Sequence, residues 1–179
     1  MTEKIIISGE GGQGIMLFGK ILAQLGLEEK RNVSWFPSYG AEVRGGTAFC
    51  MVTISDDKIS SPYVDSADTI IVMNEQSFRR FKGRIKDKGL FIINSSLVKE
   101  ELERKDLKIL RIPFTQIASS VGDTRCANMA ALGAYFKERR FFSLKNVMKR
   151  LREIFEDKGT LKLNERAVRE GMKLVGSSQ

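Results

Sequence analysis

The sequence predicts an α/β fold: a single domain with a mainly parallel sheet and helices on both faces. Apolar runs of strand length alternate with segments in which apolar residues recur every three or four positions. The first run, residues 4–8, breaks into glycines and then resumes with helical spacing, which reads as strand, tight loop and helix. A chain of 179 residues can bury one substantial core, and it shows neither repeats nor linkers. We therefore expect one domain over residues 1–179.

The elements of the first half follow from hydrophobic spacing. Apolar residues on one helical face predict a helix from Ile15 that ends near residues 26–31. A second strand is expected from Asn32 to Phe36, where the chain runs into Pro37. The β-rich run from Thr47 to Ser55 predicts one long strand, a candidate for an antiparallel direction. A buried strand is expected over residues 69–73.

The second half continues the alternation of strands and helices. Its polar residues predict caps: Asn74 for a helix to about Ile85, Asn94 to Ser96 for a short helix, Ser143 for the helix 144–157, and Asn164 for a last helix through Val175. The remaining predicted elements are strands over 89–93 and 108–112 and helices over 114–121 and 125–136.

The loop Gly9 to Gly14 has the spacing of a Rossmann-like start, Gly9-x-Gly11-x-x-Gly14. Glycines permit close approach, and the free N–H groups of the helix that follows can bind an anion. A dinucleotide site also calls for an acidic residue about 20 positions further on, at the end of the second strand. Glu28 and Glu29 come too early for that role. The pattern is therefore weak evidence for NAD.

The rarest residue types exclude several kinds of chemistry. The chain has two cysteines, Cys50 and Cys126, and no histidine. Iron–sulfur clusters usually need about four thiolates, and His-based hydrolase triads need an imidazole. We therefore expect no metal, cluster or haem held by this chain alone. Cys50 is predicted to be buried, and Cys126 is either a packed side chain or, near a helix start, a thiol of lowered pKa.

The net charge of +8 raises the question of nucleic acid. Acidic residues are interleaved with the later basic stretches, and no aromatic-studded nucleic-acid motif accompanies them. A solvated basic surface is the favoured interpretation, and an acidic protein partner stays open. No run approaches the ~20 apolar residues that span a membrane, and no signal peptide is visible. We expect a cytoplasmic protein that binds neither nucleic acid nor membrane.

Two loops together carry a resemblance to a known family. Ser8-Gly-Glu-Gly-Gly-Gln-Gly14 and Tyr39-Gly-Ala-Glu-Val-Arg-Gly-Gly-Thr47 resemble the gamma subunit of 2-oxoacid:ferredoxin oxidoreductases, which is related to the gamma domain of pyruvate:ferredoxin oxidoreductase. Ala67-Asp68 and the segment 128–134 are similar to the same family, so the resemblance spans most of the chain. The second loop is more similar to the 2-oxoglutarate-type branch than to the pyruvate branch.

The resemblance implies a multi-subunit enzyme that decarboxylates a 2-oxoacid, forms its acyl-CoA and reduces ferredoxin. It implies thiamine diphosphate on alpha and beta subunits, iron–sulfur clusters on other chains, in some cases a delta subunit, and coenzyme A as co-substrate. This chain would carry no catalytic residue and would be inactive alone. The substrate pocket would lie on other subunits, so the 2-oxoacid is not readable here.

The candidate site lies on the two loops. The first contributes Gly9, Gly11, Gly12, Gln13 and Gly14 toward coenzyme A or a subunit contact, and the second contributes Tyr39, Glu42, Arg44, Gly45 and Gly46. Arg44 is suited to a bidentate pair with phosphate or carboxylate. The alternative is structural: the glycines permit tight packing, and Glu42 pairs with Arg44. Two rival functions stay open, a stand-alone NAD or flavin oxidoreductase or nucleotide-binding protein, and a basic binding module.

Overall fold

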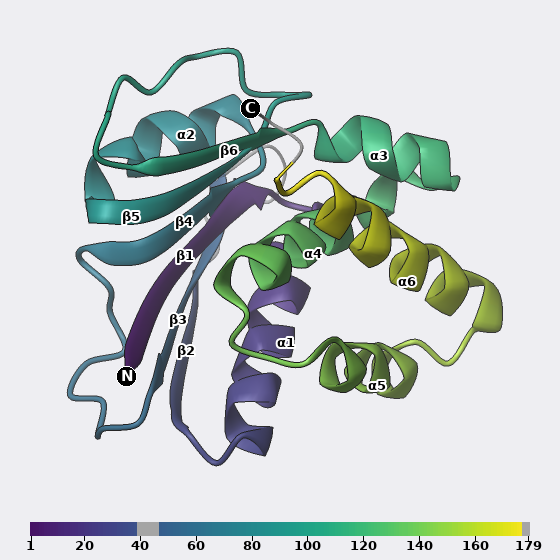
Figure 1. Ribbon diagram of the computed structural model, residues 1–179, viewed down its shortest axis with the longest axis horizontal. Coiled ribbons are helices and arrows are strands. Elements are labelled where there is room, and N and C mark those ends of the chain that lie inside the picture. The colour runs from purple at the N-terminus through teal and green to yellow at the C-terminus, as the bar shows by residue number, and fades with distance from the viewer. Residues whose placement is uncertain (39–46, 177–179) are drawn as a thin grey trace.

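A six-stranded sheet forms the centre of the chain, for which the computed structural model describes residues 1–38 and 47–176 (Figure 1). The strand order is β2-β3-β1-β4-β5-β6. β3 pairs antiparallel with both of its neighbours, whereas β1, β4, β5 and β6 pair parallel in turn. The predicted antiparallel direction of Thr47–Ser55 is therefore confirmed. The strands are β1 (Thr2–Glu10), β2 (Asn32–Ser38), β3 (Thr47–Ser55), β4 (Ala67–Val72), β5 (Ile85–Asn94) and β6 (Lys108–Ile112).

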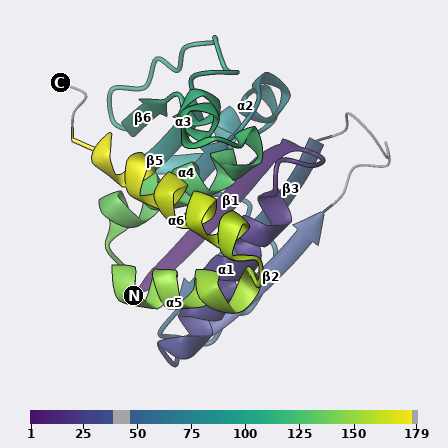
Figure 2. The same ribbon diagram turned by 90° about the vertical axis from the view of Figure 1, so that its right-hand side faces the viewer.

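Helices cover both faces of the sheet, as predicted (Figures 1 and 2). The larger core lies under α1, α3, α4, α5 and α6, and the smaller core lies under α2. β1 serves both cores, because Ile5 and Ile7 point to the first and Ile6 to the second. The helices are α1 (Ile15–Glu28), α2 (Glu75–Phe81), α3 (Phe114–Val121), α4 (Ala127–Arg139), α5 (Leu144–Ile154) and α6 (Lys158–Lys173), with short 3₁₀ turns η1 (Lys82–Arg84) and η2 (Thr124–Cys126).

Several predicted elements are found at their expected bounds. β3, β6 and α3 match residue for residue. Asn74 and Ser143 cap α2 and α5, since their side-chain oxygens accept the N–H groups of Ser77 at 3.0 Å and Asn146 at 3.1 Å. The apolar stripe of α5 belongs to the core, where Val147 and Leu151 are fully buried. Four elements differ slightly from their predicted bounds: β2 extends through Ser38, β4 covers 67–72, α4 covers 127–139 and α5 ends at Ile154.

The predicted helix from Glu75 to Ile85 is too long. α2 ends at Phe81, one 3₁₀ turn follows, and β5 begins at Ile85, where it pairs with Ala67. The register then shifts before Leu90 pairs with Thr69, and Lys88 adopts a positive φ of 60° within this irregular stretch. Ile85 is buried in the same core as Phe78 and Phe81 of α2. Its position in the apolar spacing therefore did not reveal the change from helix to strand.

The predicted short helix after Asn94 is absent from the described chain. Asn94 instead closes a turn, in which its Oδ1 accepts the N–H of Ser96 at 3.3 Å. The guanidinium of Arg111 then donates to the carbonyl oxygens of Val98 and Glu100, each at 2.8 Å. These bonds hold the backbone after the turn in an extended course because they engage carbonyls that a helix would use.

The last helix begins earlier than predicted. Asp157 caps α6, because its Oδ2 accepts the N–H of Thr160 at 2.7 Å. Asn164 lies inside the helix and donates to the carbonyl of Thr160 at 2.8 Å. The prediction that Asn164 is the cap is therefore wrong: its side chain bonds back to the preceding turn.

A buried ionic cluster closes the edge where the parallel strands begin. Glu3 accepts a hydrogen bond from Thr69 at 2.6 Å and lies 3.1 Å from Nε of Arg139. Burial raises the pKa of Glu3 above its usual value, against the lowering effects of Thr69 and Arg139. The strands end at the opposite edge, where the glycine loop lies. Among residues 1–38 and 47–176, no helix has the length and apolar character needed to cross a membrane.

Candidate functional site

The glycine loop connects the central strand to the first helix. β1 ends at Glu10, which pairs with Thr47 of β3, and α1 begins at Ile15. Gln13 closes the turn between them: its Oε1 accepts the N–H of Glu10 at 2.8 Å, and its own N–H donates to the carbonyl of Glu10 at 3.1 Å. The side chain of Gln13 is thus engaged within the loop.

The four glycines of the loop differ in what surrounds them. A Cβ on Gly9 would lie 2.5 Å from Oε1 of Gln13, and one on Gly14 would lie 2.1 Å from Nδ2 of Asn128. A Cβ on Gly11 or Gly12 would have no atom within 4 Å. Gly12 and Gly14 also adopt positive φ values of 94° and 71°. Side chains therefore crowd Gly9 and Gly14, and Gly14 has a positive φ as well, whereas Gly11 has neither constraint.

The start of α1 offers free backbone donors. Gly14 is the N-cap residue and supplies no side-chain cap, and the first intrahelical bond returns from the N–H of Phe18 to the carbonyl of Gly14 at 3.0 Å. The N–H groups before Phe18 therefore have no intrahelical acceptor, and the helix dipole favours negative charge beside them. Asn128 of α4 fixes this end, since its Nδ2 donates to the carbonyl of Gly14 at 3.1 Å.

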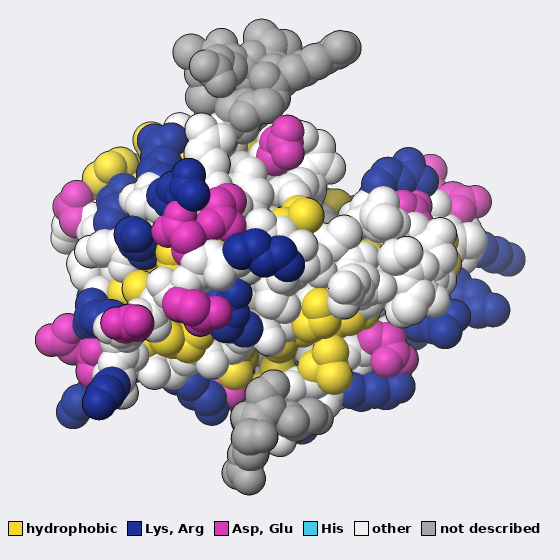
Figure 3. Space-filling model, turned by 90° about the horizontal axis from the view of Figure 1, so that it is seen from above, with side chains coloured by type: hydrophobic (Ala, Val, Ile, Leu, Met, Phe, Trp, Pro, Cys, Tyr) yellow, Lys and Arg dark blue, Asp and Glu magenta, His cyan; other side chains and the backbone are white. Residues whose placement is uncertain are grey.

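Three shallow hollows surround the loop. One of about 260 Å³ is lined by Gly11, Gly12, Met16 and neighbouring backbone. Two others of about 240 Å³ each lie toward α3, α4 and α6 and include Gly12 and Gly14 respectively. Figure 3 looks onto this edge of the molecule from above. Within residues 1–38 and 47–176, the loop therefore stands at a concave, open surface.

Arg125 is the site residue that the sequence did not single out. It lines both of the hollows toward α4, and its side chain is 85% exposed. Asp123 holds it in a two-point contact, with Nε of Arg125 2.9 Å and its terminal nitrogen 2.7 Å from Oδ2. These hydrogen bonds lower the pKa of the Asp123 carboxyl, so the pair stays ionised at neutral pH. The sequence Asp-x-Arg just before a helix was the available signal.

The loops after β4 and β5 connect neighbouring strands and helices through buried hydrogen bonds. Asn94 is fully buried and donates to the carbonyl of Met73 at 3.2 Å and to Oγ1 of Thr115 at 3.0 Å. Ser8 donates to Ser77 at 2.9 Å and thereby ties β1 to α2. The loops after β4 and β5 lie at the same edge as the glycine loop, because these strands run parallel to β1, but their side chains hold strands and helices together.

The second predicted loop lies outside the described residues. Tyr39, Glu42, Arg44, Gly45 and Gly46 all fall between Ser38, the last residue of β2, and Thr47, the first residue of β3. The described part of the chain places only the two ends: Thr47 pairs with Glu10 at the glycine loop, and Ser38 pairs with Phe49. The roles predicted for these five residues stay predictions.

Neither cysteine is a reactive thiol. Cys50 is fully buried, as predicted, and burial raises its pKa to about 12. Cys126 is 3% exposed, and burial raises its pKa as well, so the alternative of a lowered thiol pKa is wrong. In the ranges 1–38 and 47–176, no group of three or more His, Cys, Asp or Glu side chains is arranged to hold a metal ion.

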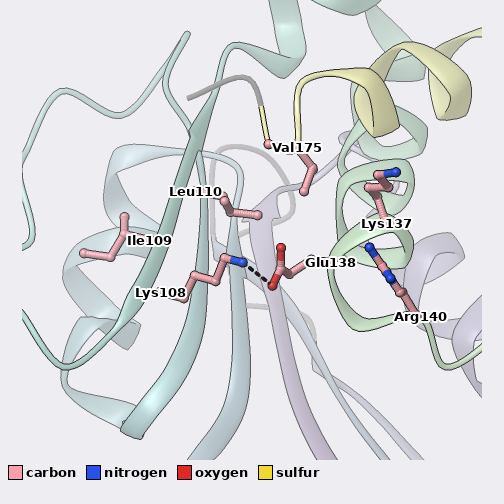
Figure 4. Close-up of a pocket in the computed structure, with 8 residues that line it drawn as sticks. Lys108, Ile109, Leu110, Lys137, Glu138, Arg140 and Val175 are labelled. Atoms are coloured by element: carbon pink, nitrogen blue, oxygen red, sulfur yellow. Dashed lines mark ion pairs between the residues drawn. The ribbon is translucent and has the colours of Figure 1, made fainter. Parts of the chain in front are cut away.

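A hollow of about 460 Å³, larger than those at the glycine loop, lies away from the loop, between β6 and the ends of α4 and α6. Lys108 and Glu138 point toward one another there and form an ion pair at 2.6 Å (Figure 4). Because β6 begins at Lys108, this hollow belongs to the opposite edge of the sheet from the candidate site.

Comparisons with known proteins agree over nearly the whole chain. The family model "Pyruvate ferredoxin/flavodoxin oxidoreductase" matches residues 4–174. The 2-oxoglutarate synthase subunit KorC of Methanocaldococcus jannaschii is 32% identical over 178 residues, which cover 98% of this chain and 95% of KorC. The ketoisovalerate oxidoreductase subunit VorA of Methanothermobacter marburgensis is 36% identical over 130 residues, 73% of this chain. The match covers only 27% of VorA, so this chain corresponds to about a quarter of that relative.

Solved structures also match this chain over nearly its whole length. The gamma subunit of a keto/oxoacid ferredoxin oxidoreductase from Geobacter sulfurreducens is 25% identical with a TM-score of 0.84, and the match covers 98% of this chain and 99% of that one. A 2-oxoglutarate:ferredoxin oxidoreductase chain from Magnetococcus marinus, solved with 2-oxoglutarate, coenzyme A and succinyl-CoA, is 26% identical with a TM-score of 0.91. That match covers 99% of this chain and 32% of the other.

Proposed function

Because this chain belongs to the pyruvate ferredoxin/flavodoxin oxidoreductase family, we propose that it is the gamma subunit of a multi-subunit 2-oxoacid:ferredoxin oxidoreductase. The observation that supports this proposal is how much of each relative the chain matches. The chain matches nearly all of KorC and of the Geobacter gamma subunit, and it matches a part of the longer VorA and Magnetococcus chains. Residues 1–179 then form one gamma-type domain, which is a separate subunit here and part of a larger chain in those two relatives.

The complex carries out the oxidative decarboxylation of a 2-oxoacid to its acyl-CoA with reduction of ferredoxin, and its proposed substrate is 2-oxoglutarate. Thiamine diphosphate and iron–sulfur clusters belong to partner chains, the alpha and beta subunits and in some cases a delta subunit. Two distant buried cysteines give this chain no site for a cluster, so no electron-transfer step is assigned to it. The complex works in the cytoplasm.

The glycine loop is the part of this chain that faces coenzyme A. Gly11 and Gly12 leave room for a phosphate to approach the backbone, and the N–H groups at the start of α1 supply donors. Arg125 adds a guanidinium at the side of the same surface. In the second loop, Arg44 is proposed to pair with phosphate or carboxylate, with Glu42 fixing its position or the subunit contact. A stand-alone NAD enzyme gains no support from this arrangement, since the ribose carboxylate is missing.

The ligand role is tested by coenzyme A kinetics of the full complex. Gly11→Val fills the open space without a positive φ to strain, and Arg125→Ala removes the guanidinium. Each is expected to raise KM for coenzyme A about tenfold, with KM for the 2-oxoacid unchanged. Arg44→Ala tests the second loop in the same way.

Lys105→Ala is the matched control for Arg125→Ala, because Lys105 is an exposed basic residue far from the loop. Thermal unfolding of each variant separates loss of binding from loss of fold. Unchanged coenzyme A affinity and turnover in both Gly11→Val and Arg125→Ala would rule out the ligand role, and the glycines would then serve packing alone.

A further inference from the structure

The solvent face of α6 is basic beyond its first turn. From residue 161 onward, its exposed positions are Lys162, Arg166, Arg169 and Lys173. Spacings of four, three and four residues place these side chains on one helical face. We call these four residues the basic stripe.

The carboxylates of α6 leave most of this stripe uncompensated. Glu165 pairs with Arg152 of α5 at 3.1 Å, and Glu170 pairs with Lys173 at 2.8 Å. In the described part of the chain, no carboxylate lies within ion-pair distance of Lys162, Arg166 or Arg169. The positive charge of these three side chains is therefore available to another molecule.

The stripe is held on a rigid support. α6 approaches α4 so closely that a Cβ on Gly171 would lie 1.9 Å from the carbonyl oxygen of Ala130, and one on Gly133 would lie 2.0 Å from that of Val168. Ala167 and Val168 are fully buried in the same contact. A partner would therefore meet charges on a fixed backbone, which lowers the ordering cost of binding.

The basic surface continues past the end of the helix. Val175 and Gly176 line the hollow of about 460 Å³ together with the exposed Lys137 and Arg140. Figure 4 shows Lys137 and Arg140 on one side of this hollow, apart from the Lys108–Glu138 pair. The hollow thus extends the positive charge of the stripe and gives it a concave end.

We propose that the basic stripe is the docking surface for a transient acidic protein partner. The large exposed apolar side chains of the described chain, Trp35 and Leu97 among them, lie outside α6, so the stripe has none of the apolar centre typical of a permanent interface. Charge complementarity without such a centre favours fast, salt-sensitive encounters. Resting on the proposed function, the partner it fits is the acidic carrier protein that accepts the electrons of the complex. Single-stranded nucleic acid would call for aromatic side chains on the stripe.

The test compares two triple variants in the full complex, with an acidic ferredoxin as the probe. Lys162→Gln, Arg166→Gln and Arg169→Gln remove three charges from the stripe. Lys20→Gln, Lys58→Gln and Lys105→Gln remove three exposed charges elsewhere. The stripe variant is expected to raise KM for ferredoxin at least fivefold at low salt, and the difference should shrink at high salt. Turnover with a dye acceptor should match that of the control.

Equal KM values for ferredoxin in the two variants would overturn the proposal. Loss of dye-linked turnover in the stripe variant alone would also overturn it, because that result would place the stripe in a subunit contact. Tighter binding of a labelled single-stranded RNA than of ferredoxin would overturn it as well. Failure of the proposed function is separately visible: the unmodified complex would then show no 2-oxoacid-dependent dye reduction. Direct titration of ferredoxin onto the full chain at low salt would still decide the docking role.

Discussion

At the scale of single residues, the glycine loop contains two kinds of glycine. Gly9 and Gly14 are surrounded by atoms that exclude a side chain, whereas Gly11 meets open space. The spacing pattern treats these positions alike, because it registers only where glycines occur. The difference arises from contacts with distant residues such as Asn128, which is 114 positions away from Gly14. Such contacts are created by the fold and are not visible in the loop's own sequence.

Replacing Gly14 should therefore destabilise the fold far more than replacing Gly11. Gly14→Ala combines a φ of 71° with a Cβ 2.1 Å from Nδ2 of Asn128, and we expect a loss of about 1–3 kcal/mol in the free energy of unfolding. Gly11→Ala, its matched control, should stay within about 0.5 kcal/mol. Urea denaturation of both variants measures this, and equal losses would contradict the described geometry.

At the scale of elements, polar caps were predictable where a polar residue directly precedes a regular apolar helical repeat. Asn74 and Ser143 precede apolar helical repeats and cap as predicted. Asp157 was missed because Gly159 and Thr160 follow it, residues that favour a turn as much as a first helical turn. The start of β5 was missed for a related reason. Ile85 fits the helical spacing of Phe78 and Phe81 and is buried in the same core as they are, although it belongs to a strand.

Asp157→Ala should weaken the anchoring of α6. The carboxylate accepts the N–H of Thr160, and this bond is the largest cause of the lowered pKa of Asp157. Removing the cap is expected to lower the melting temperature at neutral pH, because the N–H of Thr160 loses its acceptor. Glu156→Ala, which removes a neighbouring exposed carboxylate outside the helix, is the control and should have little effect. Thermal unfolding of the two variants provides the comparison, in which similar melting temperatures would argue against Asp157 as the cap.

At the scale of the whole molecule, the class of fold was predictable and the strand order was not. Alternating strands and helices indicate an α/β sheet, but nothing local shows that β3 inserts between β1 and β2. The candidate site was likewise predictable only in part. The glycine loop was identified from its spacing, while Arg125 comes from η2, more than a hundred residues later, and joins the loop only through the packing of α4 on α1.

We propose that this chain functions as one part of a larger enzyme, and co-purification with its partner chains is the sharpest test. A tagged copy is expressed together with untagged alpha and beta chains and recovered by its tag. We expect both untagged chains to be recovered in fixed proportion with bound thiamine diphosphate. Recovery of the tagged chain alone, while the untagged chains form an active enzyme without it, would contradict the claim.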